Sequence, residues 1–168
     1  MALSVMVAYA TKRGSTREVA EAVAETLGEQ RLDVSVRAAA EVRELDNYDG
    51  VVLGGALYMG RWHPAARRFL KRHRSTLAEL PVAVFGMGPL KNEEHDLQLS
   101  RQQLDRALAA VPEVEPISVA IFGGVVDPAK LHFPFSRMQA SDARDWDAIR
   151  VWAEHLATAL DARLLVGV

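Results

Sequence analysis

Short, nearly uninterrupted runs of nonpolar residues recur along the chain and predict strands. Four of them are residues 4–10 (SVMVAYA), 51–55 (VVLGG), 82–86 (VAVFG) and 117–122 (ISVAIF). Their length and their content of β-branched residues favour strands that are buried on both faces, as in a parallel sheet. A fifth segment, 32–37 (LDVSVR), alternates polar with nonpolar residues and predicts a strand at the edge of that sheet.

Between these segments, nonpolar residues recur at the spacing of an amphipathic helix. The pattern predicts helices over residues 15–30, 64–77, 97–111 and 149–160, and a weaker helix over 38–45. Asp145 is a candidate cap for the last of them. Strands and helices therefore alternate five times, and right-handed crossovers make the fold an α/β, doubly wound, three-layer sandwich. We expect one domain over residues 1–168.

Composition narrows the possible functions. The 168 residues include no cysteine, which excludes disulfides, thiolate-bound metals and cysteine nucleophiles, and we expect no metal site. The 20 Lys and Arg against 22 Asp and Glu give a net charge of −2, which does not favour a nucleic-acid partner. The longest uncharged runs have 11 residues, below the about 18 that a membrane-spanning helix needs. No basic residue precedes the nonpolar N-terminal stretch, so we expect no signal peptide and a cytoplasmic protein.

The loop after the first predicted strand concentrates groups that suit a phosphate. It consists of Thr11, Lys12, Arg13, Gly14, Ser15 and Thr16, and it leads directly into a helix. Free N–H groups and the helix dipole favour an anion there, and short hydroxyl side chains can reach phosphate oxygens. The alternative is that Thr11 or Ser15 only caps the helix. Six suitable residues at the carboxyl edge of an α/β sheet favour the phosphate, although the glycine fingerprints of dinucleotide and nucleoside triphosphate sites are absent.

This hexapeptide resembles the S/T-x-T-G-x-S/T loop with which flavodoxins wrap the terminal phosphate of FMN. Arg13 departs from the threonine that many flavodoxins have at its position. Residues 86–88 (GMG) are similar to the glycines that open the second flavin loop of the same family. The resemblance covers essentially the whole chain. It implies a five-stranded parallel sheet in the strand order 2-1-3-4-5, with FMN as the cofactor.

A second set of residues is similar to one group within this family, the flavodoxin-like, quinone-dependent protoporphyrinogen oxidases. The shared features are Tyr48-Asp49 before the third strand, Gly60 and His63 in the loop after it, and a basic helix. The resemblance implies an FMN-dependent oxidoreductase of porphyrin and heme biosynthesis, with a quinone or a redox protein as its partner. The alternatives are a small one-electron carrier, and a flavodoxin fold that has lost FMN and acts as a binding module.

By this resemblance, two further loops contact the flavin ring. The first supplies Ala56, Leu57, Tyr58, Met59, Gly60 and Trp62, and the second supplies Gly86, Met87, Gly88 and Pro89. We favour Trp62 over Tyr58 as the aromatic partner of the ring, the alternative for each being a place in the core. Gly86 and Gly88 alternatively only end a strand. The second loop carries no aromatic residue, which argues against a carrier of very low potential.

His63 and His132 lie in loops beside the expected ring and are the candidate proton-transferring residues. The alternative is that each is only a surface residue. The loop that begins with Gly123 and Gly124 forms either a third wall of the site or a cover in which Phe133 and Phe135 pack over the sheet.

Basic residues crowd the loop and helix after the third strand. They are Arg61, Arg67, Arg68, Lys71, Arg72 and Arg74. Such a run is typical of a solvated helix face. The alternative is a docking surface for an acidic protein, a carboxylate-bearing substrate, or anionic lipid at the inner face of the membrane. The sequence leaves the oligomeric state open.

Overall fold

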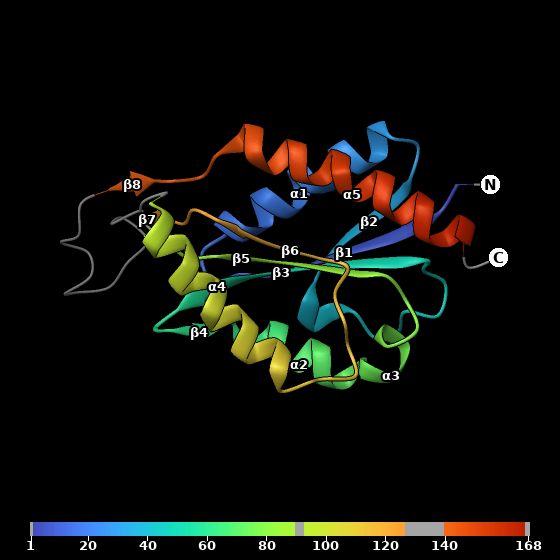
Figure 1. The fold of residues 1–168 in the computed structure, drawn as a ribbon, viewed down its shortest axis with the longest axis horizontal. Coiled ribbons are helices and arrows are strands. Elements are labelled where there is room, and N and C mark those ends of the chain that lie inside the picture. Colours follow the sequence, from blue (N-terminus) through green and yellow to red (C-terminus); the bar gives the residue numbers. More distant parts are fainter. Residues whose placement is uncertain (1, 90–92, 127–139, 167–168) are drawn as a thin grey trace.

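A parallel sheet of five main strands forms the centre of the protein (Figure 1). The computed structural model describes residues 2–89, 93–126 and 140–166. The strands are β1 (Ser4–Ala10), β2 (Asp33–Ala38), β3 (Gly50–Tyr58), β5 (Val82–Met87) and β6 (Ser118–Phe122). Their spatial order is β2-β1-β3-β5-β6, so the predicted order 2-1-3-4-5 is confirmed.

Helices cover both faces of this sheet, which confirms the three-layer sandwich (Figure 1). The helices α1 (Ser15–Glu29) and α5 (Trp146–Val166) lie on one face. The helices α2 (Pro64–Arg72), α3 (Arg74–Leu77) and α4 (Glu94–Ala109) lie on the other. Asp145 does cap α5, because its Oδ1 accepts a hydrogen bond of 3.0 Å from the N–H of Ala148.

Two of the predicted helices differ from what forms. The weak helix expected over 38–45 is only a 3₁₀ turn, η1 (Ala39–Glu41), and Val42 is already extended. Its buried residues, Ala39, Val42 and Leu45, recur every three positions, which suits a tight turn followed by extended chain. The helix expected over 64–77 is broken at His73, where φ is −104° and ψ is 14°. The His73 ring packs on Phe69, with 4.6 Å between the ring centroids.

One strand also lies in a different environment from the one expected. The nonpolar run 117–122 predicts a strand buried on both faces, but β6 is the outermost strand and Ser118–Ile121 are only half-buried. Among the described residues it pairs with β5 alone. Short ribbons complete the fold: β4 (Arg61–Trp62) pairs with β3, and β7 (Val125–Val126) pairs with β8 (Ser141–Asp142).

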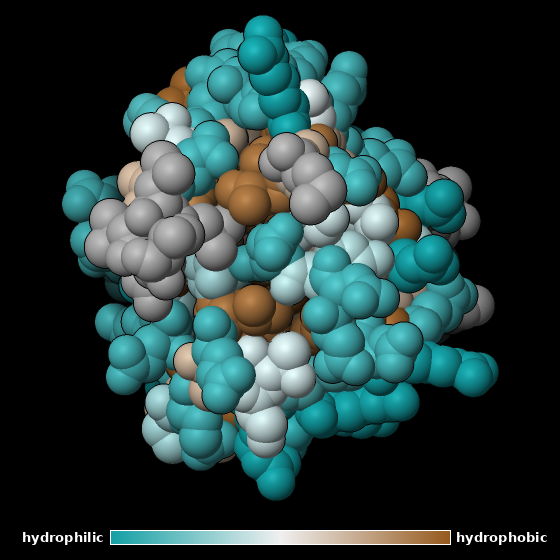
Figure 2. All heavy atoms as spheres, turned by 90° about the vertical axis from the view of Figure 1, so that its right-hand side faces the viewer, coloured by the Kyte–Doolittle hydropathy of each residue, from teal (hydrophilic) through white to brown (hydrophobic). Residues whose placement is uncertain are grey.

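At the end of the sheet where the chain termini lie, the surface is mainly hydrophilic, with small hydrophobic areas between polar side chains (Figure 2). There, Asp49 fastens β3 to β1, because its Oδ2 accepts from the Ser4 N–H at 2.8 Å and its own N–H donates to the Ser4 carbonyl at 2.7 Å.

Within the described chain, no helix is long and nonpolar enough to cross a membrane.

Two adjacent glycines let aromatic rings lie directly on the central strand β3. A Cβ atom at Gly54 would stand 2.0 Å from the Phe85 ring, and one at Gly55 would stand 2.6 Å from Nε1 of Trp62. The Trp62 indole N–H also donates a hydrogen bond of 2.9 Å to the Gly55 carbonyl oxygen. This contact holds β4, and the chain that follows it, against the sheet.

Replacing Gly55 by alanine should displace Trp62 and lower the free energy of unfolding by about 1–3 kcal/mol, the usual cost of overpacking a core. Urea denaturation and near-ultraviolet circular dichroism measure the two effects. Gly28→Ala is the matched control, because no atom lies within 4 Å of a Cβ at this position in α1. It should stabilise the protein by about 0.5–1 kcal/mol. Equal stability of the two variants would contradict the packing argument.

Stability should rise with pH in the mildly acidic range because of His73. Its imidazole is buried, and this burial lowers its pKa below the ordinary value of about 6.5. The unfolded chain therefore binds a proton at a higher pH than the folded chain, and stability is lost as the pH falls from about 6.5 towards the lowered pKa. We expect His73→Leu to reduce this slope in urea denaturation series between about pH 5 and 8. His63, whose pKa is also lowered, keeps its own contribution in that variant. An unchanged slope would contradict the assignment to His73.

Candidate functional site

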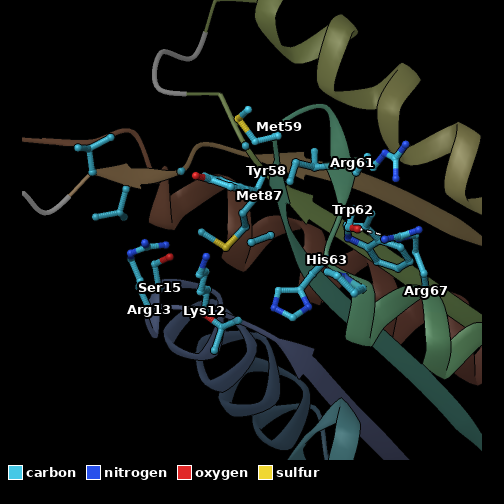
Figure 3. Close-up of a pocket in the computed structure, with 18 residues that line it drawn as sticks. Lys12, Arg13, Ser15, Tyr58, Met59, Arg61, Trp62, His63, Arg67 and Met87 are labelled. Atoms are coloured by element: carbon cyan, nitrogen blue, oxygen red, sulfur yellow. Dashed lines mark hydrogen bonds between the residues drawn. The ribbon is translucent and has the colours of Figure 1, made fainter. Parts of the chain in front are cut away.

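A pocket of about 700 Å³ opens at the carboxyl ends of β1, β3 and β5 (Figure 3). This volume lies within the usual range of small-molecule sites. The lining residues are Thr11, Lys12, Arg13, Ser15, Ala56, Leu57, Tyr58, Met59, Arg61, Trp62, His63, Pro64, Arg67, Met87, Gly88, Gly124, Val125 and Val126. Within the described part of the chain they include four Lys and Arg side chains and no carboxylate, so these residues favour an anionic ligand.

Most residues predicted to bind a cofactor meet in this pocket. The exceptions are Gly14, Thr16, Gly60, Gly86 and Pro89, which do not line it. Gly60 and Pro89 line a neighbouring groove with Met59 and Gly88. Arg61 and Arg67, two members of the basic run, line the pocket, and so does Pro64, which is not among the predicted site residues. His132 lies outside the described residues, as do Phe133 and Phe135.

The loop between β1 and α1 is closed on itself and leaves the start of the helix without a side-chain cap. The N–H of Gly14 donates to Oγ1 of Thr11 at 2.9 Å. Gly14 is the N-cap residue of α1 in a left-handed conformation, with φ of +94°, which glycine adopts without strain. Neither Thr11 nor Ser15 is the N-cap residue, which removes that alternative for the loop. The N–H groups of the first helical turn have no partner within the helix, so an anion can use them.

The hydroxyl of Thr16 supports the same interpretation. Its side chain is fully buried in the first turn of α1, and Oγ1 has no hydrogen-bond partner in the described part of the protein. A buried hydroxyl without a partner costs about 1–3 kcal/mol, which a ligand oxygen beside it would recover. With Lys12 and Arg13 in the same loop, these residues fit a phosphate group.

The β3–β4 hairpin forms the opposite side of the pocket. Met59 and Gly60 make its two-residue turn with φ of +53° and +78°. The side chain of Tyr58 is 51% exposed, and Nζ of Lys12 stands 5.3 Å from the centre of its ring. This cation–π contact links the hairpin to the β1–α1 loop across the site.

The two candidate aromatic residues differ in environment. Trp62 lines the pocket but is 1% exposed and bonded to Gly55, so most of its ring belongs to the core, which is the alternative for this residue. Tyr58 lines the pocket with a side chain that is 51% exposed, so it does not fill the core. Contact with a flavin stays a prediction for both residues.

His63 lies between Lys12 and Arg67 at the start of α2 (Figure 3). It is the N-cap residue of this helix, and its Nδ1 accepts a hydrogen bond of 3.0 Å from the Ala65 N–H. Burial lowers the pKa of its imidazole, and the charges of Arg68, Lys12 and Arg67 lower the pKa further. The ring is therefore neutral at pH 7.

Gly124, Val125 and Val126 form a third wall of the pocket. The Gly124 N–H donates to the Pro89 carbonyl at 2.8 Å, and β7 pairs with β8. Arg144, just after β8, binds Asp142 through two hydrogen bonds of 2.8 and 2.9 Å and reaches Glu18 of α1 at 3.1 Å. The wall is thus attached to the first helix by an ion pair that the sequence pattern does not reveal.

The remaining basic residues lie outside the pocket. Arg68, Lys71, Arg72 and Arg74 are exposed on α2 and α3. Neither they nor Arg61 and Arg67 form an ion pair within the described chain, although the Arg67 Nε–H donates to the Trp62 carbonyl at 3.1 Å. A role in docking stays a prediction.

The chain is similar to three curated sequences from Escherichia coli strains, all with the same description. Protoporphyrinogen IX dehydrogenase [quinone] of Escherichia coli (strain K12) is 30% identical over 87 residues. The matched part is 51% of this chain and 48% of that protein, so the chain spans about half the length of the curated relatives it matches.

Solved structures share the fold. A mutant of flavodoxin from Pseudomonas aeruginosa has a TM-score of 0.60 at 18% identity, covering 95% of this chain and 99% of its own. Oxidised flavodoxin 1 of Bacillus cereus has a TM-score of 0.60 at 14% identity, covering 95% of this chain and 97% of its own. A family model described as a flavodoxin domain matches residues 6–139, which is most of the sequence. The chain therefore belongs to the flavodoxin domain family.

Proposed function

We propose that the pocket binds FMN and that the protein is a flavin-dependent oxidoreductase of the quinone-linked protoporphyrinogen oxidase type. The observation that carries the cofactor assignment is the β1–α1 loop with its buried, unpartnered Thr16 hydroxyl, at one end of a largely nonpolar pocket. The similarity to the Escherichia coli dehydrogenase supports the reaction type.

The residues that would hold FMN fall into two groups, one at its phosphate and one at its ring. The hydroxyls of Thr11, Ser15 and Thr16, the N–H groups of the first turn of α1, and the cations Lys12 and Arg13 would hold the phosphate. The side chains of Tyr58, Leu57 and Met87 would contact the ring, since all three line the pocket. Bound FMN supplies hydride and electron transfer, and the protein positions it and excludes water.

A small electron carrier is the second candidate function. It is favoured by the fold, because the structural match covers 99% of a bacterial flavodoxin. Two observations favour the enzyme instead. The segment 86–89 has no aromatic residue to cover the ring, and Arg61 and Arg67 add cations to the pocket wall at some distance from the phosphate-type loop (Figure 3).

FMN should bind flavin-free protein more tightly than riboflavin, which lacks the phosphate, and quenching of flavin fluorescence measures both. Thr16→Val should weaken FMN binding about ten- to hundredfold, the usual value of a hydrogen bond to a charged group. It should not lower the stability of the flavin-free protein, because the hydroxyl has no partner there. Thr26→Val, at another buried threonine of α1, is the control and should leave FMN affinity unchanged. Equal affinity for riboflavin and FMN would contradict the phosphate site.

Reductive titration of the FMN-loaded protein should separate the enzyme from the carrier. We expect one spectral phase that ends at two electrons per flavin, followed by reoxidation with a quinone. Turnover of protoporphyrinogen IX with that quinone would support the finer assignment. Two separate phases of one electron each, without quinone-dependent turnover, would favour the carrier.

A further inference from the structure

The position of His63 is fixed by four hydrogen bonds. Its backbone N–H donates to the carbonyl oxygen of Ala56 on β3 at 2.8 Å. Its carbonyl oxygen accepts from the N–H groups of Ala66 at 3.0 Å and Arg67 at 3.1 Å. Its ring atom Nδ1 accepts from the Ala65 N–H at 3.0 Å. Both the main chain and the ring are therefore held before any ligand arrives.

These contacts also determine which ring nitrogen carries the proton. A nitrogen that accepts a hydrogen bond from a backbone N–H has no proton of its own, so the neutral ring of His63 is protonated at Nε2. The imidazole lines the pocket, and no hydrogen bond engages Nε2 in the described part of the protein (Figure 3). The pocket thus contains a donor that no group among residues 2–89, 93–126 and 140–166 uses.

The surroundings oppose a second proton on this ring. Lys12 of the β1–α1 loop and Arg67 and Arg68 of α2 all act on it with positive charge. The N-terminal end of α2, against which Nδ1 is bonded, is also electropositive. Arg13 and Arg61 line the same pocket, and none of the lining residues that the structure describes is a carboxylate. Protonation at Nδ1 would additionally break the cap of α2.

We infer that His63 is a specificity-determining hydrogen-bond donor, whose Nε2–H binds a carbonyl oxygen of the molecule in the pocket, and that it does not act as a base. The inference rests on the proposed function for the identity of that molecule. The carbonyl belongs either to the flavin ring or to a quinone beside it. Both are uncharged acceptors that a neutral imidazole N–H suits.

A pair of substitutions separates this role from helix capping. Asparagine is among the best N-cap residues, so His63→Asn keeps the cap and removes the Nε2–H donor, while His63→Ala removes both. We expect the unfolding free energy of His63→Asn to stay near that of the wild type and that of His63→Ala to fall. Ligand binding should instead weaken by about two- to tenfold in both variants, as for the loss of one neutral hydrogen bond.

The measured quantity identifies the source of the carbonyl. A weaker FMN affinity assigns it to the flavin ring. A higher KM for a quinone such as menadione, with unchanged FMN affinity, assigns it to the substrate. If His63→Asn matches the wild type in both, His63 is only a cap and the inference is overturned.

The tautomer is tested without any ligand. Long-range ¹H–¹⁵N spectra of the histidine-labelled protein should show an unprotonated Nδ1 and a protonated Nε2 at pH 7. A proton on Nδ1, or a charged ring at pH 7, would overturn the inference. Because this spectrum needs no flavin, failure of FMN to bind the wild-type protein would contradict the proposed function and leave the tautomer result standing.

Discussion

The close approach of two aromatic rings to the central strand is the constraint on which the site depends. With no side chains at Gly54 and Gly55, Phe85 lies against one glycine and Trp62 against the other. Trp62 holds β4 in place, and α2 begins at Pro64. His63, which lies between them, is therefore positioned at the pocket. The geometry of the β3–β4 side of the pocket is thus determined by packing in the core, where the buried Trp62 indole N–H keeps a hydrogen-bond partner.

Arginine residues near the pocket differ from those elsewhere in whether they form ion pairs. Away from the pocket, Arg17, Arg101, Arg144 and Arg150 each pair with carboxylates. At the hairpin side of the pocket and along α2, no ion pair is formed within the described residues by Arg61, Arg67, Arg68, Lys71 or Arg72. Within a chain of net charge −2, this separation produces a positive field at one end of the sheet, where an anionic cofactor or substrate would enter.

The sequence predicts the sheet better than it predicts the site. Buried parallel strands leave nonpolar runs, so four of the five strands follow from the pattern, and their order follows from the resemblance to flavodoxins. The break at His73 depends on its contact with Phe69 and could not be read from helical spacing, which continues through it. The burial of Trp62, which the sequence favours as the aromatic partner of the ring, depends on the space left by Gly55. The link from Arg144 to Glu18 joins positions 126 residues apart, which no local pattern encodes.

The ion pair between Arg144 and Glu18 affects the order in which the parts of the pocket form during synthesis. The phosphate-type loop and α1 are made before the wall that faces them, and Arg144 joins this wall to α1 by an ion pair with Glu18. Such distant contacts form late, because closing a long loop costs chain entropy. A nascent chain can therefore form β1 and α1 early, but the third wall of the pocket is joined to α1 only after Arg144 has left the ribosome.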